Sequence, residues 1–573
     1  MNNMKKGNII NWLLSGIVVL FITATSCNID PTFYSQTVPE TFYTSQDAVW
    51  ERFSRPFTHW RWYLGQDAPR WMMQELGTDE FCLPTRGSDW YDGAKYQKMH
   101  HHEYTSDMAW ISSGWTNFAM GVALSWDALE DLEKVDFDKL GFASGTRESM
   151  LSQQQTLVAS FYLDGLDFFG GVPLYTTTQS EVKGRSTALE TFNFIDSLLN
   201  VATPNLPVKD KLGAMETGSI HRAVAAVLKA RLYFNAETYI GKDMYSQAAA
   251  ICQDIIDGKY GKYALDTDWT NIFGFTNETC PEIIWSVPSQ NSKQQTDGMY
   301  WSYMVPYNYK NYLGGLVSSG SNNGIGLIPS LDPSGNRYPY KLGGAYAKFN
   351  DKDIRKQPYV YEGNGKYHGM FIVGLLQNPL HTDWVCTGSR EYKGQTLVVR
   401  DQVAYFAKVG KDSKYPTVES LPSTIGTAEE NSCVRVTKRS PRPNMDEKSV
   451  MYNPDVPVMR LAEVYYMLAE CKMRAGDKQG AATLINTVRK RYFTDGDPNP
   501  VTAANLDKYR MLDEWQQEFL AEGRRRTDLV RWNAYVTEDW WDHKATNNAN
   551  LNRFPIHYSI IGANNLLEQN PGY

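Results

Sequence analysis

The cysteines of this 573-residue chain are few, and none of them forms a Cys-x-x-Cys pair. The absence of such pairs argues against zinc ribbons and thioredoxin-like redox chemistry. Six cysteines scattered over the chain after the first one also do not make a disulfide framework. Two of them lie among aliphatic residues on predicted helix faces, where we expect buried free thiols. The cysteines are Cys27, Cys82, Cys252, Cys280, Cys386, Cys433 and Cys471, and the two on helix faces are Cys252 and Cys471.

Strong charge of one sign is also lacking. The formal net charge of −7 is small for a chain of this length, so there is no basic footprint for nucleic acid and no polybasic segment for anionic lipid. We therefore expect no nucleic-acid partner.

The motifs of common enzyme classes are missing too. The chain has no Gly-x-Ser-x-Gly elbow, no Walker loop and no His-Glu-x-x-His helix, and these motifs carry much of hydrolase, NTPase and zinc-protease chemistry. Three consecutive histidines, His100, His101 and His102, lie in a polar stretch, and we expect them to be solvated. The sequence thus predicts a protein that is not an enzyme and that needs no cofactor and no metal.

Only one long apolar run is present, from Ile9 to Ile22, and it is at the N-terminus behind Lys5 and Lys6. The small residues Thr23-Ala24-Thr25-Ser26 then precede Cys27, which is the order of a secretory signal ending at a lipidated cysteine. We predict a signal peptide over residues 1–26, lipidation of Cys27 and a tether over residues 27–45. An ordinary cleaved peptide and an uncleaved anchor helix are the alternatives.

Aromatic residues, in contrast, are abundant: 17 Trp, 35 Tyr and 23 Phe make up 13% of the chain. A large core explains many of them. Several others cluster in polar stretches rich in Gly, Asn and Asp, where a flat ring with polar neighbours suits a sugar, because a pyranose offers C–H groups to the ring and hydroxyls to the neighbours.

Helical periodicity dominates most of the chain. It predicts helices over 115–133, 148–169, 192–201, 221–239, 245–256 and two more between 458 and 492. The helices of 221–256 and those of 458–492 each turn at a Gly and Asp and have Ala at positions of close contact, which is typical of tetratricopeptide-like hairpins that stack on one another. A bundle of unrelated helices is the alternative.

Helical periodicity largely disappears between residues 285 and 450, where Gly, Asn, Pro, Ser and Tyr accumulate. An irregular segment of this length is usually functional. We predict a mostly α fold in which a tetratricopeptide-like scaffold carries a loop-rich lobe. The divisions are 46–284 for the N-terminal helical part, 285–450 for the lobe and 451–573 for the C-terminal helices, all interwoven in one domain.

Several motifs resemble those of the SusD/RagB family of nutrient-binding lipoproteins. Phe168-Phe169-Gly170-Gly171-Val172-Pro173-Leu174 is similar to the turn that follows a family helix. Further matches are Arg460-Leu461-Ala462-Glu463-Val464-Tyr465 with Ala469-Glu470, then Asn486, Arg489 and Arg491, then Glu518-Phe519, Glu522-Gly523, Arg525, Asp528-Leu529 and Arg531-Trp532, and the tail Leu566 to Tyr573. We expect Glu518, Glu522, Arg525, Asp528 and Arg531 to form ion pairs between helices.

The resemblance implies a lipid-anchored protein at the cell surface, in the outer membrane, that binds glycan or sometimes peptide. It also implies a partner, a SusC-like TonB-dependent outer-membrane barrel to which the ligand is delivered. A tetratricopeptide scaffold that binds only protein and a surface glycosidase are the less favoured functions.

Two aromatic, polar stretches are the candidate binding site. One contains Asp79, Arg86, Asp89, Trp90, Tyr91 and Tyr96, and the other contains Tyr300, Trp301, Tyr303, Tyr307, Tyr309 and Tyr312. Trp90, Tyr91 and Trp301 are the predicted stacking residues, and Asp79, Arg86 and Asp89 the predicted partners of sugar hydroxyls. Trp384 is a further candidate. The alternative for each ring is that it fills a gap between lobe and scaffold.

Overall fold

The structure is a computed structural model. It describes residues 43–65, 68–213, 218–289, 303–307, 322–363, 366–377, 382–386, 391–411, 413–438 and 454–573. The predicted signal peptide, Cys27 and most of the tether lie outside this range. None of the helices in the described part combines the length and the apolar character that crossing a membrane requires.

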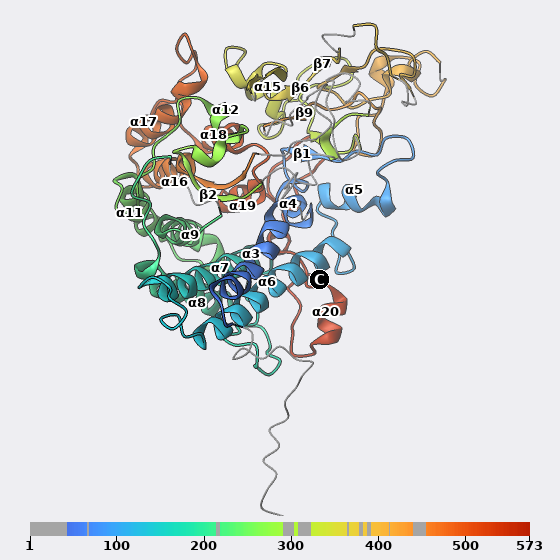
Figure 1. The fold of residues 1–573 in the computed structure, drawn as a ribbon. Coiled ribbons are helices and arrows are strands. Elements are labelled where there is room, and N and C mark those ends of the chain that lie inside the picture. Colours follow the sequence, from blue (N-terminus) through green and yellow to red (C-terminus); the bar gives the residue numbers. More distant parts are fainter. Residues whose placement is uncertain are drawn as a thin grey trace, which may run out of the picture.

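Helices form a curved array in which each packs on the next, in the order α3, α6, α7, α8, α9, α11, α16 and α17 (Figure 1). Their bounds are Gln46–Gly65, Ala109–Glu133, Thr146–Phe169, Ala188–Ala202, Arg222–Phe234, Tyr245–Ile256, Leu461–Arg474 and Lys478–Arg489. The contact between α11 and α16 joins two helical hairpins that are far apart in the sequence. The predicted tetratricopeptide-like scaffold is therefore confirmed.

Small residues allow the close helix packing in this array. Ala223, Ala226 and Ala230 of α9 are all at most 3% exposed. On α6, a Cβ added at Gly121 would lie 2.3 Å from the ring of Phe161 on α7. A larger residue at either place would push the helices apart, because interiors of this density have no spare volume.

Side chains also decide where the helices begin and end. Asp477 accepts a hydrogen bond from the Gly480 amide over 2.8 Å and so begins α17, as expected for an N-cap. The helix predicted to continue to residue 239 is interrupted at Asn235, whose φ of −105° and ψ of 10° are not helical. The Asn235 side chain and its backbone amide both donate to the Arg231 carbonyl there. A short helix, α10 (Ala236–Ile240), follows.

The remaining elements are shorter. The helices are α4 (Ala68–Glu75), α5 (Lys95–His100), α12 (Trp269–Phe273), α15 (Ala345–Lys348), α18 (Lys508–Phe519), α19 (Arg525–Arg531) and α20 (Tyr558–Ala563). The strands are β1 (Phe81–Cys82), β2 (Ile283–Val287), β3 (Gly326–Leu327), β4 (Val360–Gly363), β5 (Lys366–His368), β6 (Phe371–Ile372), β7 (Gly374–Leu375), β8 (Val398–Val399), β9 (Arg435–Val436) and β10 (Val456–Arg460).

The loop-rich lobe lies between β2 and β10, and its described residues form short two-stranded ladders, turns, the four-residue helix α15 and three 3-10 helices of three residues each. β2 and β10 pair antiparallel, so the chain leaves the scaffold and returns to it at the same place. Within the lobe, β4 pairs with β5, β6 with β9 and β7 with β8. In Figure 1 the lobe, in yellow and light orange, lies at the opposite side of the molecule from α6, α7 and α8.

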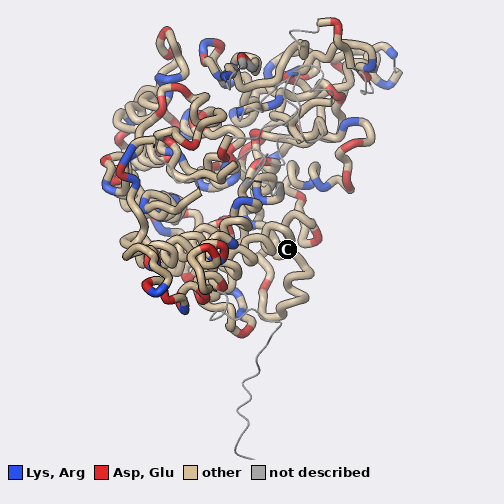
Figure 2. Tube along the Cα trace, in the orientation of Figure 1, with Lys and Arg blue, Asp and Glu red and all other residues tan. Residues whose placement is uncertain are grey.

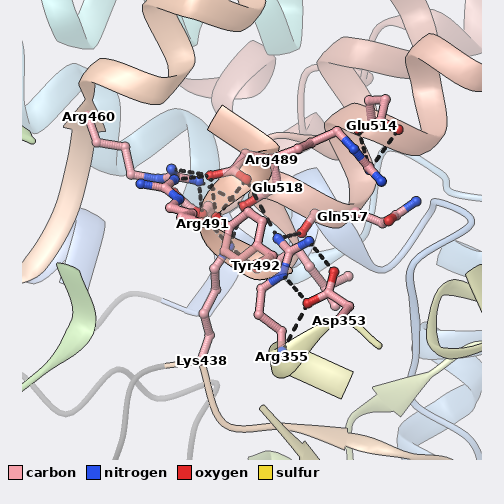
Figure 3. A network of polar contacts seen from close by, with 12 residues as sticks. Asp353, Arg355, Lys438, Arg460, Arg489, Arg491, Tyr492, Glu514, Gln517 and Glu518 are labelled. Atoms are coloured by element: carbon pink, nitrogen blue, oxygen red, sulfur yellow. Dashed lines mark hydrogen bonds and ion pairs between the residues drawn. The ribbon is translucent and has the colours of Figure 1, made fainter. Parts of the chain in front are cut away.

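Buried charges cluster where the C-terminal helices meet the scaffold (Figure 3). The Glu518 carboxylate accepts from Arg460 Nη1 at 2.6 Å, from Arg491 Nη2 at 2.7 Å and from the Tyr492 hydroxyl at 2.8 Å. Although burial alone would raise the pKa of Glu518, the guanidinium groups of Arg491, Arg460 and Arg355 hold it well below its usual value. The predicted ion pairs between helices are therefore present.

Two of the other predicted ion-pair residues, Arg525 and Arg531, bind partners on distant segments. Arg525 pairs with Asp79 at 2.6 Å, 446 residues away in the sequence. Arg531 binds Glu470 through two hydrogen bonds of 2.8 and 2.9 Å, and it also lies 2.8 Å from Asp528. These pairs tie α19 to the first and last thirds of the chain.

Candidate functional site

The first predicted aromatic stretch is attached to the lobe at its start. β1 pairs antiparallel with β3, with Phe81 opposite Leu327, and farther along the Thr85 amide donates to the Ile425 carbonyl over 2.8 Å. The chain from residue 83 to α5 therefore runs along the lobe rather than along the scaffold. α5 follows it at the edge of the molecule, next to the lobe (Figure 1).

Trp90 brings the two predicted stretches into contact. Its indole N–H donates to the Asn322 carbonyl over 2.9 Å, and its ring centroid lies 5.2 Å from that of Tyr303 in an edge-to-face arrangement. A Cβ on Gly324 would lie 3.0 Å from the indole, so glycine is needed there for the ring to approach the backbone. One residue before, the Asp89 carboxylate accepts from the Tyr307 hydroxyl over 2.6 Å.

Further rings extend this contact into a continuous group. Tyr96 lies 5.9 Å from Trp90 and 4.9 Å from Trp110, measured between ring centroids. Tyr91 follows Trp90 directly in the sequence and is 56% exposed. We call the group formed by Trp90, Tyr91, Tyr96, Trp110 and Tyr303 the aromatic surface.

The backbone of the aromatic surface is held in an uncommon conformation. Trp90, Asp92 and Ala94 have φ angles of 65°, 42° and 62°, and Gly93 between the last two has 68°. Non-glycine residues in this left-handed region cost free energy and persist only where the surroundings impose them. Such positions concentrate at binding sites, so the strain here supports a functional role for the loop.

Polar groups next to the rings give the surface hydrogen-bonding capacity. Asp92 pairs with Lys95 at 3.1 Å, and the Lys95 ammonium lies 4.9 Å from the ring of Tyr96. Burial, assisted by the negative charge of Asp92, raises the pKa of Tyr303. Its phenol therefore stays protonated at neutral pH and can donate a hydrogen bond.

Two predicted hydroxyl partners lie inside the protein instead. Asp79 is fully buried against Arg525, and Arg86 is 2% exposed. The Arg86 guanidinium donates to the backbone carbonyls of Glu429 and Gly324 over 2.5 and 3.2 Å. Both side chains therefore secure the base of the N-terminal stretch, and we remove them from the candidate ligand contacts.

The other predicted residues differ in their exposure. Tyr96 is only 4% exposed and packs against Trp90, whereas Asp89 and Trp90 are half-buried. Tyr300, Trp301, Tyr309 and Tyr312 lie outside the described residues, and Trp384 is half-buried in the lobe. The sequence analysis did not single out Trp110, which lies in the first turn of α6, before the predicted helix start at residue 115.

The interpretation of the three histidines as solvated is wrong. His100 is fully buried, His102 is 3% exposed, and only His101 has partial access to solvent. Burial is the main cause that lowers the pKa of both His100 and His102 to about 3. The polar neighbours in the sequence predicted exposure. The residues that bury these histidines, however, come from the C-terminal region, and they are Trp540, Trp541 and His543.

A separate cavity of about 160 Å³ lies between the helices α4, α7 and α9 and the strands β9 and β10. Its charged lining residues are already paired with opposite charges, for instance Arg70 with Asp164 at 2.7 Å, Arg231 with Glu463 at 2.7 Å and Lys438 with Glu522 at 2.5 Å. A ligand would have to break these pairs to bind there. The aromatic surface is therefore the stronger candidate site.

Comparisons with known proteins match most of the chain. A sequence profile described as the SusD family matches residues 281–573. The starch-binding protein SusD of Bacteroides thetaiotaomicron is 26% identical over 438 residues, which cover 73% of this chain and 71% of that protein. SusD-like protein P25 of Formosa agariphila is 30% identical over 425 residues, covering 72% of this chain and 69% of that protein.

Solved structures share the fold. A SusD superfamily protein from Bacteroides fragilis has a TM-score of 0.65 at 18% identity, covering 93% of this chain and all of that one. A surface glycan-binding protein from Bacteroides thetaiotaomicron, in complex with laminarihexaose, has a TM-score of 0.60 at 16% identity over 92% of this chain and all of that one. The matched sequence profile and the similarity to the Formosa protein show that the chain belongs to the SusD family.

Proposed function

We propose that the protein binds oligosaccharide at the cell surface through the aromatic surface and passes it to a TonB-dependent outer-membrane barrel of the SusC type. The contact between Trp90 and Tyr303 carries this proposal, because it joins two aromatic stretches that are distant in the sequence, the first of which also contains the exposed Tyr91. The starch-binding relative and the laminarihexaose complex of a protein with the same fold support a glycan as the ligand.

In this proposal, aromatic rings stack on the sugar and polar side chains bind its hydroxyls. Tyr91 offers an exposed ring for the C–H face of a sugar, and Trp90 holds that part of the loop in place. Asp92, Lys95 and the Tyr303 hydroxyl lie next to the rings and are the proposed partners of sugar hydroxyls. Asp89, whose carboxylate accepts from the Tyr307 hydroxyl, is a further proposed contact. Trp301 and Tyr300 remain proposed contacts because they are adjacent in the sequence to Tyr303.

The first test is calorimetric titration of the purified protein with plant, fungal and host oligosaccharides, and with peptides as the competing ligand class. We expect one glycan class to bind with a Kd in the micromolar range or weaker. If only peptides bind, the ligand of this protein is a peptide and not a glycan. Release of shorter sugars during the titration would indicate a glycosidase and contradict a purely binding role.

Replacing Tyr91 by alanine is expected to weaken that glycan binding about fivefold, since an exposed stacking ring contributes about 1 kcal/mol. Titration of the variant with the same glycan measures the effect. Tyr558→Ala is the matched control, because Tyr558 on α20 is 62% exposed and belongs to no part of the aromatic surface. Equal affinities of the two variants would contradict the assignment of Tyr91.

The lipid anchor is part of the proposed function and has its own test. Cleavage before Cys27 followed by diacylglycerol transfer would hold the binding face at the membrane, and each buried methylene contributes about 0.8 kcal/mol to such anchoring. Mass spectrometry of the mature protein should find an N-terminal peptide that begins at Cys27 and carries the lipid. An unmodified peptide beginning elsewhere would contradict the anchor.

A further inference from the structure

His100, His101 and Asp542 come together at the junction of α5 and the C-terminal region. One nitrogen of each imidazole and one oxygen of the carboxylate all lie within 4.8 Å of one another. His101 Nε2 lies 3.5 Å from Asp542 Oδ2. Neither the aromatic surface nor the ion pairs of the scaffold use these three side chains.

The hydrogen bond of His100 fixes its tautomer. Its Nε2 lies 3.0 Å from the Trp541 carbonyl, and a carbonyl oxygen can only accept. Nε2 therefore carries the proton, and the lone pair is at Nδ1. This Nδ1 is buried and has no hydrogen-bond partner among the described residues. An imidazole that donates to a carbonyl with one nitrogen and keeps the other free is arranged as metal-binding histidines are.

Asp542 is held in place in a similar way. Its Oδ2 accepts a hydrogen bond from the Ile425 amide over 2.7 Å, and its backbone is left-handed with a φ of 51°. The side chains of His101 and Asp542 are 32% and 21% exposed. The group is thus ordered from within the protein and open to solvent on one side.

We propose that His100, His101 and Asp542 bind Zn²⁺ or a divalent transition metal of similar preference. Two imidazoles and one carboxylate are ligands that zinc favours, and three protein ligands leave one position for water. Ligand atoms around a tetrahedral zinc lie about 3.4 Å apart, given bonds of about 2.05 Å. The 3.5 Å between His101 and Asp542 already matches this spacing, and the other two pairs lie within 4.8 Å, so a bound zinc would draw them closer together.

The metal links two segments that lie far apart in the sequence. α5 carries Tyr96 of the aromatic surface and ends at His100, while Asp542 follows Trp540 and Trp541 in the C-terminal region. A bound metal fixes α5 to that region and so limits the movement of Tyr96, which contacts Trp90. Zinc binding itself does not depend on glycan binding, so either property can fail without the other.

Zinc titration of the purified full-length protein tests this site, after chelator treatment and with an affinity tag free of histidine. We expect one Zn²⁺ per chain with a Kd at or below about 1 μM. His101→Gln and Asp542→Asn should each weaken binding at least tenfold. Saturating Zn²⁺ should raise the Tm of the unmodified protein by about 2 °C. Co²⁺ should give the visible absorption bands of a four-coordinate site, and both substitutions should remove them.

His368→Gln is the matched control. His368 Nδ1 lies 2.7 Å from Glu362 on the surface, a histidine–carboxylate pair without a second imidazole, so its substitution should leave zinc binding unchanged. Both variants should fold, because Asp542→Asn keeps an acceptor for the Ile425 amide and the His101 side chain is 32% exposed. Circular dichroism would verify this. Absence of zinc binding, or equal binding by all three variants and the unmodified protein, would overturn the proposal.

Discussion

Replacing Glu518 by glutamine should lower the free energy of unfolding by about 3–5 kcal/mol, the usual cost of removing one partner from a buried ion-pair group. Four buried cations, Arg355, Lys438, Arg460 and Arg491, and four carboxylates, Asp353, Glu282, Glu518 and Glu522, balance one another there. Glutamine leaves one positive charge uncompensated. Urea denaturation followed by circular dichroism measures the change, and the Tm should fall by about 3–4 °C.

The pH dependence of this difference provides a second observation. Because the pKa of Glu518 is held well below its usual value in the folded state, its contribution is complete above the unfolded pKa of about 4.3 and is lost as the pH falls below it. The difference between the two proteins should therefore shrink on acidification. Glu362→Gln, at a site 49% exposed, should change stability by less than about 0.5 kcal/mol. Equal effects of Glu518→Gln and Glu362→Gln would contradict the role of the buried network.

Replacing Trp90 by alanine should weaken glycan binding about thirtyfold, or about 2 kcal/mol. The indole is the shared neighbour of Tyr96, Tyr303 and Gly324 and donates to the Asn322 carbonyl. Without it, the left-handed backbone around Asp92 loses the packing that imposes it, and Tyr91 loses its fixed position. Calorimetric titration with the glycan identified for the unmodified protein measures this loss.

Trp90→Phe separates ring packing from the indole hydrogen bond. Phenylalanine keeps a ring against Tyr96 and Tyr303 but cannot donate to the Asn322 carbonyl, so we expect an affinity between those of the unmodified protein and Trp90→Ala. Unchanged thermal unfolding of both variants would exclude a general loss of structure. Full glycan affinity in Trp90→Ala would place the binding site away from the aromatic surface.

The helical scaffold is the part of the fold that the sequence predicts well. The predicted helix over 245–256 has the same bounds in the structure, and the turn at Gly476 and Asp477 lies where expected, because period, caps and turn residues are local signals. The break between α9 and α10 at Asn235 was not predicted, because it falls within an uninterrupted apolar pattern.

Site residues were harder to predict, because their environments are made by distant parts of the chain. The contact of Trp90 with Tyr303 follows the prediction that the two aromatic stretches act together. Asp79 looked like a ligand contact because the sequence around it is polar, but its partner, Arg525, is on α19. His100 looked solvated for the same reason, although residues from the C-terminal region bury it.

The ion pair between Asp79 and Arg525 also affects the order in which the chain folds during its synthesis. A nascent chain that ends before residue 525 has no guanidinium to neutralise this buried carboxylate, so the segment around β1 stays hydrated until synthesis is nearly complete. Stable closure of the core thus waits for the last helices.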